Sequence, residues 1–138
     1  QIVIKSYCVL ITKATILIID PDKASSIFLK EALLMILPNA DNYQILVTAY
    51  GKEAIDMCQK EKPDLVFTEL RLKDLEGFQV IRKLKNLYPE TTIITETAMT
   101  ESQFEQKAWD AGCDGYLTKP LDFSELEDLI KALFEVSS

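Results

Sequence analysis

Short apolar runs alternate with longer amphipathic segments along most of the chain. The runs are rich in β-branched residues and occupy residues 15–19, 44–49, 65–68, 92–95 and 115–117. Continuous apolar runs of this length are typical of strands that are covered on both faces of a parallel sheet. We therefore expect a buried strand at each of these positions.

The intervening segments carry apolar residues at helical spacing. Helices are expected at 22–37, 51–60, 77–87, 100–111 and 124–133. The last two should begin with capping boxes, formed by Thr100 with Gln103 and by Ser124 with Glu127. Strands that alternate with helices predict one α/β domain with a doubly wound, five-stranded parallel sheet. Because crossovers are right-handed, the flavodoxin-like strand order 2-1-3-4-5 is the leading topology.

Residues 1–13 precede this alternation and are largely apolar and β-branched. They are too short for a membrane-spanning helix, and they lack the small-residue cleavage site of a signal peptide. We interpret them as an N-terminal extension or linker, followed by one folded domain at 14–138.

The composition excludes several classes of function. With 48% hydrophobic and 27% charged residues, the chain resembles a soluble globular domain, and no run is long enough to enter a membrane. The net charge of −7 argues against nucleic-acid binding, which needs clustered Lys and Arg. Three widely spaced cysteines without a signal peptide fit a reducing cytoplasm. Since the sequence has no histidine, serine–histidine or cysteine–histidine catalysis is excluded.

Polar side chains follow four of the predicted strands. Asp20, Glu69, Thr97 and Lys119 lie at or just beyond strand ends that meet at one edge of the expected sheet. Two carboxylates, a hydroxyl and an ammonium suggest an acyl-phosphate or metal–phosphate site. For any one of these residues alone, satisfying an exposed strand end is the simpler explanation.

Four segments, taken in order, carry a family resemblance. They read Ile-Leu-Ile-Ile-Asp at 16–20, Asp-Leu-Val-Phe-Thr-Glu at 64–69, Thr97-Ala98 and Gly-Tyr-Leu-Thr-Lys-Pro at 115–120. In order and spacing they resemble the receiver domains of two-component response regulators. The resemblance implies a receiver-like domain at 14–138 that acts as a signalling module in a two-component or phosphorelay system, and not as an enzyme.

The same resemblance implies that the phosphoacceptor site is altered. Glu69 stands at the acceptor position, which the family almost always fills with aspartate. Asp20 matches the first acid of the metal-binding pair, but Pro21 stands at the second and has no carboxylate. Asp20 and Glu69 are therefore weak metal candidates, and only weak Mg²⁺ binding is expected. Asp22 joins this acidic pocket only if the loop shifts, because its position favours capping the next helix.

The other family positions are retained. Thr97 matches the switch hydroxyl, Tyr116 the aromatic that moves with it, and Lys119 the lysine that pairs with phosphate. The bond before Pro120 is a candidate cis peptide. Phosphoryl transfer needs tight positioning, so a longer acceptor and a lost metal ligand predict that phosphotransfer is lost. We expect phosphorylation-independent protein–protein signalling instead.

The expected partners are other signalling proteins or flanking domains. In receivers, the fourth helix, fifth strand and fifth helix commonly engage a partner or a second copy, which makes a homodimer through this surface one possibility. Trp109 lies beside the apolar stripe of the fourth helix, so an interface role and packing at a buried edge are equally open. The sequence does not identify the cognate kinase or the output.

Other interpretations of the same residues stay open. A haloacid-dehalogenase-type phosphatase would use Asp20 as nucleophile and Asp22 as acid and base with Mg²⁺, although Ala24 departs from its motif. A flavin or nucleotide binder would need a glycine-rich loop, which the chain lacks. A purely structural docking or dimerisation domain shares every residue assignment but has no working switch.

Overall fold

The computed structural model describes residues 14–134, in which five strands alternate with five helices. The strands are β1 (Ala14–Ile19), β2 (Tyr43–Thr48), β3 (Leu65–Thr68), β4 (Thr92–Thr97) and β5 (Gly115–Thr118). The helices are α1 (Lys23–Ile36), α2 (Gly51–Glu61), α3 (Gly77–Leu87), α4 (Ser102–Ala111) and α5 (Phe123–Phe134), with a short 3₁₀ turn at Ala40–Asn42. The strands pair in parallel in the order β2-β1-β3-β4-β5, which confirms the predicted flavodoxin-like topology.

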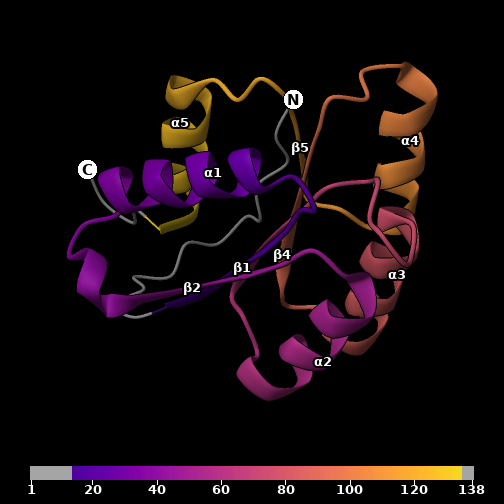
Figure 1. Ribbon diagram of the computed structural model, residues 1–138, viewed down its shortest axis with the longest axis horizontal. Helices are drawn as coiled ribbons and strands as arrows, with labels where there is room; N and C mark the ends of the chain where they lie inside the picture. The colour runs from indigo at the N-terminus through magenta and orange to yellow at the C-terminus, as the bar shows by residue number, and fades with distance from the viewer. Residues whose placement is uncertain (1–13, 135–138) are drawn as a thin grey trace.

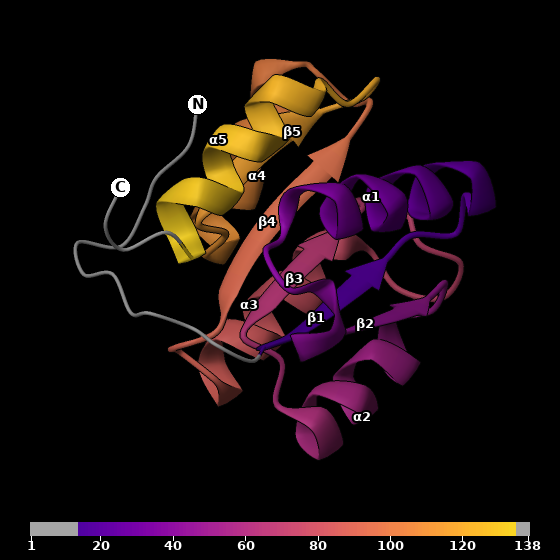
Figure 2. The same ribbon diagram turned by 90° about the vertical axis from the view of Figure 1, so that its left-hand side faces the viewer.

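Helices cover both faces of the sheet. α1 and α5 lie on one face, and α2, α3 and α4 lie on the other (Figures 1 and 2). Along β1, Ile16 and Ile18 belong to the core beneath α1 and α5, whereas Leu17 and Ile19 belong to the core on the other face. All four side chains are at most 1% exposed. Burial on both faces is the reason that the strand is continuously apolar.

The predicted capping boxes of the last two helices are wrong. α4 begins at Ser102 after Glu101, whose side chain makes no capping hydrogen bond. α5 begins at Phe123, and Asp122 Oδ1 accepts the backbone N–H of Glu125 at 3.1 Å. Ser124 therefore lies within the first turn and not before it. Local sequence allowed either start, and the path of the preceding loop decides which residue reaches the exposed N–H groups.

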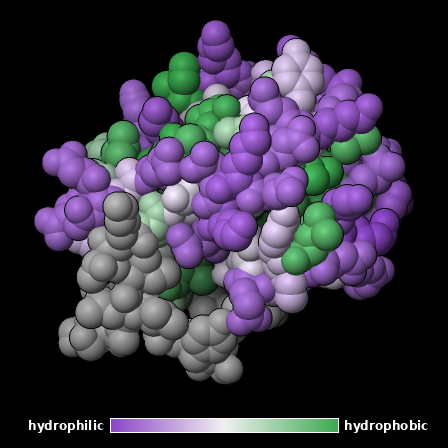
Figure 3. Space-filling model, turned by 90° about the horizontal axis from the view of Figure 1, so that it is seen from below, coloured by the Kyte–Doolittle hydropathy of each residue, from purple (hydrophilic) through white to green (hydrophobic). Residues whose placement is uncertain are grey.

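The face of the molecule seen from below is mostly hydrophilic, with apolar side chains in small separate groups (Figure 3). No helix in the described part of the chain is both long and apolar enough to cross a membrane. The proposed extension at 1–13 lies outside the described residues.

Candidate functional site

The ammonium of Lys119 binds two carboxylates at the carboxyl edge of the sheet. Its Nζ lies 2.7 Å from Asp20 Oδ2 and 2.9 Å from Glu69 Oε1. Asp20 follows β1, Glu69 follows the adjacent β3, and Lys119 follows β5. The side chains of Lys119, Asp20 and Glu69 are only 14%, 3% and 11% exposed. Tertiary folding thus brings three of the four predicted edge residues into one largely buried ion-pair cluster.

The carboxylate of Glu69 is engaged through both oxygens. While Oε1 faces Lys119, Oε2 accepts the backbone N–H of Leu70 at 2.6 Å and that of Arg71 at 3.4 Å. The loop after β3 folds back so that the N–H of Gly77 donates to the carbonyl of Leu70 at 2.9 Å. A Cβ on Gly77 would lie 2.4 Å from the carbonyl oxygen of Glu69, so only glycine fits this close approach. The loop backbone after β3 thus holds the Glu69 carboxylate through the N–H groups of Leu70 and Arg71.

The carboxylate of Asp20 is also held on two sides. Oδ1 accepts the backbone N–H of Asp22 at 2.9 Å, and Oδ2 faces Lys119. Burial raises the pKa of Asp20, and this effect outweighs the nearby ammonium. For Lys119, burial disfavours the charged form, but the hydrogen bonds to Asp20 and Glu69 outweigh it and raise the pKa of the lysine. Lys119 is therefore a fixed positive charge between the two acids.

Asp22 does not join this acidic pocket. It occupies the position before α1, and its carboxylate accepts the hydroxyl of Ser25 at 2.6 Å. That hydrogen bond is the main reason that the pKa of Asp22 is lowered. The expected acidic pocket is therefore reduced to Asp20 and Glu69, and Pro21 between the two aspartates adds no charge.

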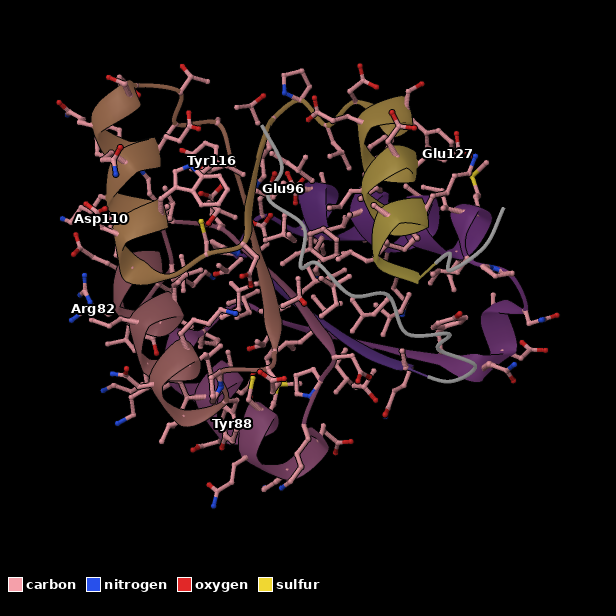
Figure 4. The ribbon with its side chains drawn as sticks, turned by 180° about the vertical axis from the view of Figure 1, so that it is seen from behind. Arg82, Tyr88, Glu96, Asp110, Tyr116 and Glu127 are labelled. Carbon is pink, nitrogen blue, oxygen red and sulfur yellow. The ribbon has the colours of Figure 1, made fainter. Side chains whose placement is uncertain are left out.

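Thr97 and Tyr116 meet at the loop after β4 and not at Lys119. The hydroxyl oxygen of Thr97 accepts the backbone N–H of Met99 at 3.2 Å. The hydroxyl of Tyr116 donates to the carbonyl of Met99 at 2.5 Å, and its ring is buried on the α4 side of the sheet (Figure 4). Burial raises the pKa of Tyr116 to about 12. Both predicted switch residues thus hold the same loop, which leads directly into α4.

Glu96 is a site residue that the sequence analysis missed. It lies in β4 on the side of α1 and α5 and is 4% exposed, and its carboxyl forms no hydrogen bond or ion pair with any described residue (Figure 4). Burial raises its pKa to about 7; Lys119 opposes this shift, and Asp20 and Glu69 add to it. The available signal was a charged residue directly after an apolar run, but the predicted strand ended one residue earlier, at Thr95.

The site lacks the oxygen ligands of a magnesium cage. Mg²⁺ prefers six oxygen ligands in near-ideal octahedral geometry. Here both carboxylates of the cluster already bind Lys119, and Pro21 supplies no side-chain oxygen. Within residues 14–133, no group of three acidic, cysteine or histidine side chains could hold a metal ion. Asp20 and Glu69 therefore supply only part of the oxygen ligand set that Mg²⁺ prefers.

Two further predicted residues lie away from the cluster centre. The peptide bond between Lys119 and Pro120 is cis. Trp109 on α4 is half-buried and packs against the core on that face, and its Nε1 donates to Glu105 at 3.2 Å. Its ring is thus partly available to a partner, while its polar edge is already satisfied.

Comparison with known proteins places this geometry in context. The family model of the response regulator receiver domain matches residues 16–131. The chain is 28% identical over 123 residues to sporulation initiation phosphotransferase F of Bacillus subtilis (strain 168), covering 89% of this chain and 95% of that protein. It is 30% identical over 118 residues to response regulator MprA of Mycolicibacterium vanbaalenii, covering 86% of this chain but only 49% of that regulator.

Solved structures of receiver domains and response regulators are also similar in fold to this chain. A two-component response regulator from Clostridium difficile is similar with a TM-score of 0.78 at 32% identity, covering 87% of this chain and 94% of that chain. The receiver domain of sensor histidine kinase PA1611 from Pseudomonas aeruginosa, which holds a coordinated magnesium ion in its active-site cleft, has a TM-score of 0.77 at 20% identity. That match covers 88% of this chain and 98% of that domain, and at this identity it concerns the fold.

Proposed function

Because this chain belongs to the response regulator receiver domain family, we propose that it is a two-component signalling module whose state is set by a partner protein and not by phosphorylation. The observation that carries this proposal is the cluster in which Lys119 binds Asp20 at 2.7 Å and Glu69 at 2.9 Å. The ammonium stands between the two carboxylates, where it neutralises charge that a divalent cation would otherwise balance.

The position of Glu69 argues against efficient phosphoryl transfer. In-line transfer depends on tight placement, and a misplacement of about 1 Å can cost about a hundredfold in rate. Glu69 is one methylene longer than aspartate, and its second oxygen is tied to the N–H of Leu70 at 2.6 Å. Proline at position 21 removes a metal ligand from the same site. Both phosphoryl transfer to the acceptor and binding of the cation should therefore be impaired.

The ion pair of Glu69 with Lys119 biases a conformational switch without locking it. Reversing a two-state equilibrium from 1:99 to 99:1 takes about 5.5 kcal/mol. An exposed ion pair contributes about 1 kcal/mol or less, and for this largely buried pair the cost of desolvation offsets much of the attraction. The remainder has to come from differential binding of a partner. This is why we assign the control of the module to a protein and not to the glutamate alone.

The contacts of Thr97 and Tyr116 indicate where such a partner acts. Both side chains hold Met99 in the loop before α4. The backbone N–H of Lys119 donates to the carbonyl of Thr97 at 2.8 Å, so a partner on α4, β5 and α5 would bias this loop and the adjoining Lys119 cluster together. We propose this surface for another signalling protein, a flanking domain or a second copy of the chain. Trp109 is the candidate anchor because large aromatic side chains dominate interface energetics.

Other roles of the site follow from the same contacts. We assign no catalytic role to Asp20 and Asp22, because one binds Lys119 and the other binds Ser25. We expect at most weak Mg²⁺ binding, at Asp20 and Glu69. We also place the module in the cytoplasm, where the buried thiols of Cys58 and Cys113 remain reduced.

Incubation with acetyl phosphate and Mg²⁺, followed by intact-protein mass spectrometry, tests the proposal. The natural chain should show no stable gain of one phosphoryl group. A double variant, Pro21→Asp with Glu69→Asp, restores the family's acids and should gain the phosphoryl group under the same conditions. A phosphoryl group on Glu69 of the natural chain would refute the proposal.

A further inference from the structure

A pocket of about 300 Å³ opens between the first turns of α1 and the loop that joins β5 to α5. Its α1 side includes Ser25 and Phe28, and its loop side includes Pro120 and Leu121. Phe28 is 51% exposed, whereas Glu96 in the same lining is 4% exposed. This volume is at the small end of the range for ligand pockets, about 300–1,000 Å³, so the occupant has to be small.

The carboxyl of Glu96 forms part of the wall of this pocket. The residue is 4% exposed, and its carboxyl has no hydrogen-bond partner among the described residues. Its oxygens are not among the fully buried atoms that lack a partner, so they remain accessible from the pocket. Lys119 also lines the pocket, but its ammonium is occupied by Asp20 and Glu69. The pocket therefore contains a carboxyl that a positive group could reach.

The local charge favours a cation. Asp20 and Glu69 carry two negative charges and Lys119 carries one positive charge, so the ion-pair cluster is negative before Glu96 is counted. The residues that α1 contributes to the wall carry no charge. A positive group that enters the pocket meets the unpaired Glu96 carboxyl; Lys119 lies nearby, but the two carboxylates that bind it outweigh its charge.

The chemistry of the wall selects the kind of cation. A hard divalent ion needs about six oxygen ligands, whereas this wall offers the Glu96 carboxyl, the Ser25 hydroxyl and otherwise mostly hydrocarbon. Ser25 donates its proton to Asp22 at 2.6 Å, so its oxygen still accepts a hydrogen bond. An alkylammonium has three N–H donors at one end and an apolar stem, which matches the buried acid and the exposed Phe28.

We propose that this pocket binds a primary ammonium group on an unbranched alkyl chain. The ammonium pairs with Glu96 and donates to Ser25, and the alkyl stem lies along Phe28 and Leu121. Such a group occurs on the lysine side chain of a protein partner and on small linear amines. The inference goes beyond the signalling proposal, because it holds whether or not Glu69 accepts phosphate.

Titration of the ¹⁵N-labelled chain with n-butylammonium chloride, followed by ¹H–¹⁵N spectra, tests this inference. We expect saturable shifts at the amides of Ser25, Glu96 and Leu121. Neutral n-butanol and sodium chloride, matched in alkyl chain and in ionic strength, should leave these amides unmoved. Shifts that follow either control equally would overturn the inference.

Two variants locate the binding group. Glu96→Gln keeps the shape of the side chain and should weaken binding by about tenfold or more, which is the worth of a charge-assisted hydrogen bond. Phe28→Leu should weaken it by about two- to fivefold, because the smaller side chain covers less of the alkyl stem. Glu127→Gln is the matched control, because this carboxylate lies on α5 with its side chain 39% exposed and should leave binding unchanged. Undiminished binding in Glu96→Gln would contradict the assignment.

A second ligand separates the two sources of the amine. Nα-acetyl-lysine N-methylamide carries the same ammonium on a peptide backbone. If it binds as tightly as n-butylammonium, the pocket accepts a lysine side chain of a partner. If only the free amine binds, the occupant is a small molecule, and in both cases the requirement for Glu96 stands.

Discussion

The substitution Glu96→Gln should change how the stability of the protein depends on pH. Burial raises the pKa of Glu96 from 4.5 to about 7, so the folded state holds this proton more tightly than the unfolded chain does. An acid with a raised pKa stabilises the fold fully below pH 4.5, and that stabilisation is lost as the pH rises through about 7. Glutamine has no proton to lose and removes this dependence.

The size of the effect follows from the two pKa values. The interval from 4.5 to about 7, at about 1.36 kcal/mol per pH unit, corresponds to about 3 kcal/mol of unfolding free energy. Most of this falls between pH 5 and pH 8. The natural chain should therefore lose about 2–3 kcal/mol more than the Glu96→Gln variant across this interval. The variant should be the more stable protein at pH 8.

Urea unfolding at pH 5 and pH 8, followed by far-ultraviolet circular dichroism, measures this difference. The raised pKa of Asp20 and the lowered pKa values of Asp22 and Asp74 also change stability with pH, but both proteins share these groups. Their effect is removed when the two pH dependences are subtracted. Parallel stability curves for the two proteins would show that Glu96 is not a buried acid with a raised pKa.

Three further substitutions test the geometry of the site. Lys119→Met leaves the Asp20 and Glu69 carboxylates without their ammonium partner and should lower the unfolding free energy by about 2 kcal/mol or more, as measured by urea unfolding. Lys131→Met removes an exposed ion pair and should change the unfolding free energy little. Gly77→Ala should lower the unfolding free energy by about 1–3 kcal/mol, because the added Cβ would overlap the backbone of Glu69. Helix propensity alone predicts the opposite, so a higher melting temperature would contradict this expectation. Tyr116→Phe removes the hydrogen bond to the Met99 carbonyl, and should lower the unfolding free energy by about 1 kcal/mol and speed amide hydrogen exchange in that loop. Unchanged exchange would show that this hydrogen bond does not hold the loop.

The fold could be predicted from the sequence because its signals are local. The apolar run before Asp20 is buried on both faces of the sheet, and any strand with that environment has to be continuously apolar. Alternation of strands with helices and right-handed crossovers then leave few topologies. The same reasoning placed Asp20, Glu69 and Lys119 at one edge, because parallel strands end on the same side.

Helix starts were less predictable, because several residues compete for each cap. Asp122 precedes α5, although Ser124 with Glu127 has the sequence of a capping box. Both patterns satisfy the local rule, and aspartate and serine are about equally favourable as N-caps. The path of the loop after β5 decided between them, and the residue pattern of the helix does not predict that path.

What the sequence by itself determined is the order of the elements and the set of polar residues at one edge of the sheet. Only the tertiary structure decided their partners: Lys119 binds Asp20 from 99 residues away and Glu69 from 50 residues away, while Thr97 and Tyr116 hold Met99 instead. It also placed the buried Glu96 beside that cluster, with no hydrogen-bond partner for its carboxyl among the described residues. Strand and helix patterns are set by neighbours a few residues apart, whereas ion pairs and burial depend on distances between segments that are remote in the chain.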